Sequence, residues 1–116
     1  ILLIDDNVPA AEGLRKLLTY KGHIVESATD SRSGLQATES FRPEAIFLDI
    51  GLPDTDGYTT ARVLRGEGFK GLLVALTGYG QEEDRARARA AGFDKHLTKP
   101  VGIADIEQVL NAALDS

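Results

Sequence analysis

Five side chains that could take part in chemistry each follow a candidate strand of the sequence: Asp5, Asp6, Asp49, Thr77 and Lys99. They supply three carboxylates, one hydroxyl and one ammonium group, which together would leave a net charge of about −2 in a small cleft. Like-charged carboxylates held so close must bind protons or a cation. Oxygen ligands that leave room for water suit Mg²⁺, which can also hold the oxygens of a phosphoryl group. These residue types therefore predict a magnesium site that supports phosphoryl transfer.

Five short strands would position these side chains. Three candidates are continuous apolar runs, which suit strands buried on both faces of a sheet: residues 1–4, 45–48 and 72–76. Two candidates are more polar and suit the edges of a sheet: residues 23–28 and 94–98. The first strand is therefore expected in the interior and the second at a border.

Segments with helical periodicity lie between and after these strands. Five helices are expected: one between Pro9 and Gly22, and four more over residues 31–42, 58–66, 82–91 and 103–114. This alternation predicts an α/β fold, a doubly wound three-layer domain with a five-stranded parallel sheet in the flavodoxin-like order 2-1-3-4-5. Other strand orders with the same two edges stay open at this point.

In such a sheet, ligands bind beyond the carboxyl ends of the strands, so all five side chains are expected at one rim. Asp49 stands alone after the central strand and is suited to attack a phosphoryl group as a nucleophile. Asp5 and Asp6 are adjacent and suited to holding a metal ion. The remaining two, Thr77 and Lys99, could bind the phosphoryl oxygens.

The segments ILLIDDN, IFLDIGLPDTDG, ALTGYG and HLTKP resemble, in order and spacing, the receiver domain of bacterial two-component response regulators. The resemblance covers the whole chain. It implies that Asp49 takes its phosphoryl group from a phosphohistidine on a sensor histidine kinase or a histidine phosphotransfer domain. It also implies that Mg²⁺ is bound directly by Asp6, Asp49 and the backbone carbonyl of Gly51, with Asp5 acting through water.

By the same resemblance, Thr77 is the switch hydroxyl and Lys99 is the family's lysine, joined to Pro100 by a cis bond. The domain would act as a phosphorylation-controlled switch of the surface around the fourth helix, fifth strand and fifth helix. It would assist its own phosphorylation and dephosphorylation without being an enzyme in its own right. The chain departs from the family at His96, where an aromatic residue usually moves with the switch hydroxyl. It departs again at Gly51, where the family commonly has a larger residue. The resemblance implies that this position and Tyr79 together shape the access of water to the acyl phosphate.

Length and composition restrict the remaining possibilities. The 116 residues suffice for one domain, residues 1–116, and the chain lacks methionine and opens inside an apolar run, which indicates a segment of a longer chain. The absence of cysteine fits a reducing, cytoplasmic setting. A net charge of −5 argues against direct nucleic-acid binding, and no apolar run is long enough to span a membrane.

The parent chain and its partners stay open at this stage. The stretch LTGYGQEEDRARARAAGFD looks most like receivers carried on hybrid sensor histidine kinases. An output domain and self-association are further candidate interactions. The main alternative function is a receiver-like interaction module that is not phosphorylated.

A second alternative is a small phosphatase that uses the DxDG sequence at Asp54 and Asp56. In such phosphatases this motif directly follows a buried strand, whereas Leu52 and Pro53 intervene here, and the chain is too short to add a substrate-covering cap. We therefore expect a turn in which Asp56 caps the third helix.

Overall fold

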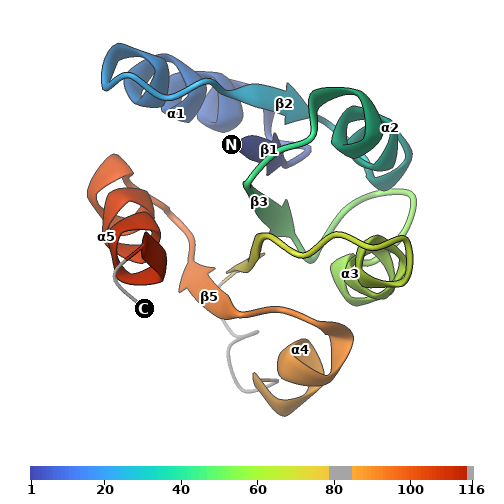
Figure 1. Ribbon diagram of the computed structural model, residues 1–116. Helices are drawn as coiled ribbons and strands as arrows, with labels where there is room; N and C mark the ends of the chain where they lie inside the picture. Colours follow the sequence, from blue (N-terminus) through green and yellow to red (C-terminus); the bar gives the residue numbers. More distant parts are fainter. Residues whose placement is uncertain (79–84, 115–116) are drawn as a thin grey trace.

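The computed structural model describes residues 1–78 and 85–114 and contains a five-stranded parallel sheet (Figure 1). The strands pair in the order β2-β1-β3-β4-β5, which confirms the predicted topology. Their bounds are β1 (Leu2–Ile4), β2 (Glu26–Ala28), β3 (Ala45–Asp49), β4 (Leu72–Thr77) and β5 (Lys95–Thr98). The acceptor candidate Asp49 is thus the last residue of the central strand.

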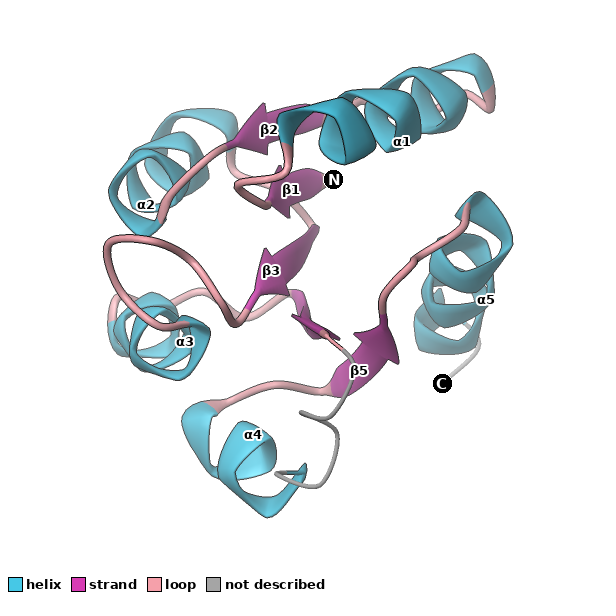
Figure 2. Cartoon of the chain, turned by 180° about the vertical axis from the view of Figure 1, so that it is seen from behind, coloured by secondary structure: helices cyan, strands magenta, loops and turns pink. Residues whose placement is uncertain are grey.

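Helices cover both faces of the sheet, as a doubly wound fold requires (Figures 1 and 2). Helices α1 and α5 lie against one face, and α2, α3 and α4 lie against the other. Their described bounds are α1 (Val8–Tyr20), α2 (Ser31–Phe41), α3 (Gly57–Gly66), α4 (Arg85–Ala91) and α5 (Ile103–Leu114). The acidic residues 82–84, expected to open the fourth helix, lie outside the described part of the chain. Among the described helices, none is both long and apolar enough to cross a bilayer.

Alternate residues of the interior strands supply two separate hydrophobic cores, because successive side chains of a strand point to opposite faces. Leu2, Ile4 and Leu48 belong to the core under α2, α3 and α4. On the other face, Leu3 and Phe47 pack with the α1 and α5 side. β1 and β3 are buried along their whole length, as their apolar runs predict.

The second strand is shorter than predicted, because pairing with β1 begins only at Glu26. The predicted strand began at His23, but the His23 N–H donates to the carbonyl of Leu18 and belongs to the turn that ends α1. Ile24 is 78% exposed and contributes nothing to the core. Gly22 occupies the left-handed region (φ +100°) in this turn, which is why the helix stops there.

The N-terminus of α3 approaches the end of β3 so closely that only glycine fits at its first position. A Cβ atom at Gly57 would lie 2.4 Å from the Cα of Ile50 and 2.9 Å from the carbonyl oxygen of Asp49. The Gly57 N–H donates to the carbonyl of Ile50 at 3.0 Å and closes the base of the β3–α3 loop. This contact sets the position of the loop that follows Asp49.

We expect Gly57→Ala to lower the free energy of unfolding by about 1–3 kcal/mol, the usual cost of overpacking, because backbone atoms must move to admit the methyl group. The matched control is Gly13→Ala in α1, where an added Cβ meets nothing within 4 Å. That change should raise stability by up to about 1 kcal/mol through helix propensity. Denaturant titration measures both, and equal effects of the two substitutions would contradict the close approach at Gly57.

Candidate functional site

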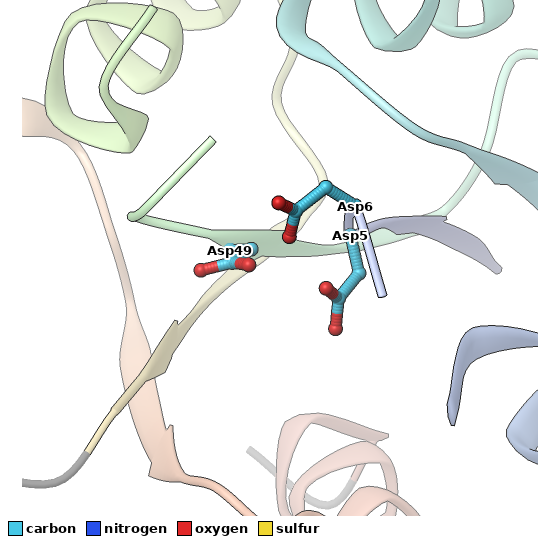
Figure 3. A group of neighbouring side chains, drawn as sticks. All are labelled: Asp5, Asp6 and Asp49. Atoms are coloured by element: carbon cyan, nitrogen blue, oxygen red, sulfur yellow. The ribbon is translucent and has the colours of Figure 1, made fainter. Parts of the chain in front are cut away.

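Three carboxylates from two strand ends lie together at one edge of the sheet (Figure 3). Asp5 and Asp6 follow β1, and Asp49 ends β3; one oxygen from each lies within 4.8 Å of the others. The side chains of Asp5 and Asp49 are buried, whereas Asp6 is exposed. Two carboxylates of the group are therefore shielded from solvent, and the third, that of Asp6, faces it.

Pairing of neighbouring strands explains why residues distant in sequence meet. β1 lies beside β3 with Ile4 opposite Leu48, so Asp5 and Asp49 follow directly on paired positions. Lys99 follows β5, the edge strand beyond β4, and its backbone N–H donates to the carbonyl of Thr77 at 2.8 Å. The peptide bond between Lys99 and Pro100 is cis.

Lys99 reaches into the carboxylate group and makes contact with two of its members. Its Nζ lies 2.8 Å from Oδ2 of Asp49 and 3.3 Å from Oδ1 of Asp5. Burial of Lys99 opposes its charged form, but hydrogen bonds and opposite charges from Asp49 and Asp5 outweigh burial and raise the pKa of the lysine. Lys99 is therefore a cation that offsets part of the negative charge of the site.

The pKa of Asp5 is raised, first because the carboxyl group is buried and also because the charge of Asp49 is near. A hydrogen bond from the Asn7 N–H and the charge of Lys99 act in the opposite direction. Carboxylates that stand directly before a helix can also act as its N-cap. The structure gives that position to Asn7, whose side chain accepts from the Ala10 N–H, and so leaves the two aspartates to the site.

The donor set fits a hard divalent cation. The three carboxylates supply only oxygen atoms, and the cluster opens to solvent at Asp6, so water can complete a coordination shell. The Gly51 N–H donates to Oδ1 of Asp49 at 2.8 Å, which fixes the orientation of that carboxylate. A Cβ at Gly51 would lie 3.6 Å from the same oxygen, in ordinary van der Waals contact with the carboxylate.

Thr77 lies at the same edge of the sheet, but its hydroxyl is directed toward β5. The side chain is buried, and Oγ1 donates to the carbonyl of Leu97 at 3.4 Å, near the limit of a hydrogen bond. The structure thus brings Asp5, Asp6, Asp49 and Lys99 into one group and places Thr77 at the same edge of the sheet, with its hydroxyl bonded to β5. Tyr79, expected to shape access to the site, lies outside the described residues.

The β3–α3 loop that follows Asp49 holds two aspartates whose carboxylates bind helix N-termini. Asp56 is the N-cap of α3 and accepts from the Thr59 N–H at 2.9 Å, as the sequence predicts. Asp54 accepts from the N–H groups of Ser31 and Arg32 at the start of α2, at 2.9 and 3.1 Å. Sequence reasoning missed this second contact, because its partners lie more than 20 residues earlier in the chain. Both acids of the DxDG sequence are thus engaged as helix caps, which agrees with the turn interpretation.

Comparison with known proteins gives a consistent result over nearly the whole chain. The family model for the response regulator receiver domain matches residues 1–111. Response regulator MprA of Mycolicibacterium vanbaalenii is 34% identical over 114 residues, which cover 98% of this chain and 49% of that protein. MprA of Mycobacterium tuberculosis H37Rv is also 34% identical, with 98% and 50% covered. The chain therefore spans about half the length of these curated relatives.

Solved structures of similar fold carry related descriptions. A CheY-like response regulator receiver domain from Methanospirillum hungatei superimposes with a TM-score of 0.89 at 26% identity, covering 98% of this chain and 91% of that chain. The receiver domain of NtrX from Brucella abortus gives a TM-score of 0.88 at 26% identity, covering 99% and 98%. Both matches extend over the full sheet and its helices.

The cap at Asp56 predicts a pH dependence of stability. Hydrogen bonds from the Thr59 backbone and hydroxyl lower the pKa of Asp56 against a smaller opposing effect of burial. A group with a lowered folded pKa stabilises the fold above its unfolded pKa, about 3.9, and this contribution is lost as pH falls through the folded value. In Asp56→Asn the amide oxygen still accepts from the Thr59 N–H. The second oxygen, which accepts from the Thr59 hydroxyl, is lost together with the charge that interacts with the helix dipole and with Arg87.

We therefore expect Asp56→Asn to cost about 0.3–1 kcal/mol at pH 7 and almost nothing once the pH is below the folded pKa. Urea titrations of both proteins between pH 7 and pH 2.5 measure the difference. Glu39→Gln, which removes an exposed charge of α2, controls for net charge. A difference between wild type and Asp56→Asn that stayed constant over this range would contradict the assignment.

Proposed function

Because the chain belongs to the family of response regulator receiver domains of two-component systems, we propose that Asp49 is its phospho-acceptor. The donor is a phosphohistidine on a sensor histidine kinase or a histidine phosphotransfer domain. The observation that carries the proposal is the carboxylate of Asp49 at the end of the central strand, held between the Gly51 N–H and the Lys99 ammonium group. No other carboxylate among the described residues combines these contacts with a position beside two further acids.

In this reaction an oxygen of Asp49 attacks the phosphorus atom, a P–O bond forms, and the P–N bond to the donor imidazole breaks. The electron pair of that bond leaves with the imidazole, which takes up a proton, and Asp49 becomes an acyl phosphate. Lys99 would bind an oxygen of the arriving phosphoryl group, a role supported by its contact with Oδ2 of Asp49. The Gly51 N–H keeps Oδ1 oriented during the attack.

The metal ligands in this proposal are Asp6, Asp49 and the backbone carbonyl of Gly51, with Asp5 acting through water. When bound, Mg²⁺ supplies positive charge that stabilises the oxygens of the transferring phosphoryl group. The support from the structure is the cluster of three carboxylates, two of them buried. Such a cluster binds a hard divalent ion with several water molecules.

The output of the site is a shift between two conformations of the domain. Thr77 would exchange its long hydrogen bond to the Leu97 carbonyl for one to a phosphoryl oxygen on Asp49. Because Leu97 lies in β5, this exchange would alter the surface formed by α4, β5 and α5. The domain acts as a switch that assists its own phosphorylation and dephosphorylation.

The longer protein that contains this domain is part of the proposal too. The chain spans about half of its curated relatives, so we propose that it works beside a further domain. That domain is either an output domain or the kinase portion of a hybrid sensor kinase. The proposal includes a cytoplasmic location, which the lack of cysteine supports, and self-association as a further means of output.

Incubation with acetyl phosphate and Mg²⁺ should add one phosphoryl group per chain, and Asp49→Asn should abolish the addition. The asparagine keeps an oxygen for the Gly51 N–H but lacks a nucleophilic carboxylate. Intact-mass spectrometry measures the adduct, and Asp56→Asn, which alters an acid outside the cluster, serves as the control and should react normally. If wild type gained no mass, the domain would be an unphosphorylated interaction module. If Asp56→Asn alone lost the reaction, a phosphatase would be indicated.

Asp6→Ala should weaken Mg²⁺ binding by at least about tenfold, since even partners outside the direct ligands commonly contribute 10–100-fold. The side chain is exposed, so the fold should be retained. Calorimetric titration measures the affinity. The control is Glu67→Ala, which removes an exposed acid from the opposite end of α3 and should bind Mg²⁺ as wild type does. Equal affinities of Asp6→Ala and wild type would refute the ligand assignment.

A further inference from the structure

The start of α2 receives hydrogen bonds from two different parts of the chain. The first four N–H groups of a helix lack partners within the helix, and here all four have one. Asp30, the N-cap, accepts the Ser33 N–H on its side chain, and its own N–H donates to the Ser33 hydroxyl. The other two N–H groups, those of Ser31 and Arg32, donate to the carboxylate of Asp54. Asp54 thus completes the cap of a helix to which it does not belong.

Ser31 connects the same helix to the end of the β3–α3 loop by a second path. Its hydroxyl lies 2.7 Å from that of Thr60, and both side chains are almost completely buried. The Thr60 hydroxyl donates to the carbonyl of Asp56 at 3.0 Å, so its remaining bond is accepted from Ser31. Ser31 therefore restrains the loop segment at both ends: its N–H binds Asp54 directly, and its hydroxyl reaches the Asp56 carbonyl by way of Thr60.

These contacts restrain one side of the loop that carries Gly51. On the N-terminal side, Gly51 is fixed by β3 and by the bond from its N–H to Asp49. On the C-terminal side, the buried side chain of Leu52 and the carboxylate of Asp54 are the next points of attachment. Glycine has the most backbone freedom of any residue, so the direction of its carbonyl depends on such attachments.

We propose that Asp54 is a positioning residue that orients the backbone carbonyl of Gly51 for Mg²⁺ by fastening the loop to the N-terminus of α2. This inference rests on the proposed function, in which that carbonyl is a metal ligand. Mg²⁺ demands near-ideal octahedral geometry, so a ligand that moves binds poorly. Asp54 itself touches neither the metal ion nor the phosphoryl group.

The test compares Mg²⁺ affinity in Asp54→Ala, Asp54→Asn and Asp30→Ala. Asp54→Ala should raise the dissociation constant about tenfold, at the lower end of the range for residues that support metal ligands. Asp54→Asn keeps one acceptor oxygen for the Ser31 N–H and should give an intermediate value. The matched control is Asp30→Ala, which removes a carboxylate from the same helix N-terminus but not from the loop, and should bind Mg²⁺ as wild type does.

A second measurement reports the mobility of the loop in the absence of the metal ion, through amide hydrogen exchange. In Asp54→Ala the amide hydrogens of Gly51 and Gly57 should exchange with solvent faster than in wild type, and in Asp30→Ala they should not. NMR-detected exchange at a pH where all variants are folded gives this comparison directly.

The outcomes separate the two proposals. If wild type binds Mg²⁺ through Asp6 but Asp54→Ala binds it equally well, the positioning role is wrong and the proposed function stands. If Asp30→Ala weakens binding as much as Asp54→Ala, a general loss of helix stability explains the effect and the positioning role is again wrong. If wild type binds no Mg²⁺ at the aspartates, the proposed function itself fails.

Discussion

Repulsion among three carboxylates is the constraint on which the site depends. Asp5 and Asp49 are removed from most of the solvent that would screen their charges, and Asp6 lies within reach of both. The raised pKa of Asp5 expresses the cost, because burial and the neighbouring charge both favour the protonated form. Lys99 offsets part of this cost by contacting Asp5 and Asp49 together. One ammonium group does not neutralise three carboxylates, so the cluster stays anionic. The site therefore still attracts a cation and, through the cation, a phosphoryl group.

The parallel sheet makes this arrangement possible, since it delivers the ends of neighbouring strands to one edge. Three adjacent strands, β1, β3 and β4, place Asp5, Asp49 and Thr77 at that edge without help from any long loop. The same edge receives Lys99 after β5, and the hydrogen bond from its N–H to Thr77 joins it to β4. Glycine at position 57 lets α3 approach the end of β3, so the loop after Asp49 is short and closed at its base. Backbone pairing therefore fixes where the charges lie, and side-chain contacts fix only how they point.

The sequence predicts which strands are interior and which residues lie at the carboxyl edge because both follow from local patterns. The order 2-1-3-4-5 is the predicted arrangement with these edges, although the patterns alone left other orders open. Runs such as 45–48 reveal buried strands, and an acid directly after such a run must lie at a strand end. The shortened β2 was not predictable in this way. The segment that begins at His23 resembles a strand in the sequence, and only the hydrogen bond from the His23 N–H to the Leu18 carbonyl joins this residue to the end of α1. Asp54 is a second case. Its neighbours Thr55 and Asp56 indicate a turn, but its partners are backbone N–H groups of a helix formed by another part of the chain. A cap within one helix has a sequence signature; a cap supplied from a distant loop has none.

The hydrogen bonds on the two sides of the site differ in length. This difference indicates on which side the proposed switch would change the structure. On the α2 and α3 side, the Asp54 carboxylate and the Ser31–Thr60 hydroxyl pair make short hydrogen bonds of 2.7–3.1 Å. On the β5 side, the Thr77 hydroxyl is joined to Leu97 by a bond of 3.4 Å, which costs little to break. A phosphoryl group on Asp49 offers Thr77 a charged acceptor, and charge-assisted hydrogen bonds are the stronger ones. In the proposed switch the exchange would therefore be favourable at Thr77, whereas the short bonds that Asp54 and Ser31 make on the α2 and α3 side would cost more to break. The structural response to phosphorylation should accordingly spread toward β5 and its neighbouring helices while the loop around Gly51 keeps its position.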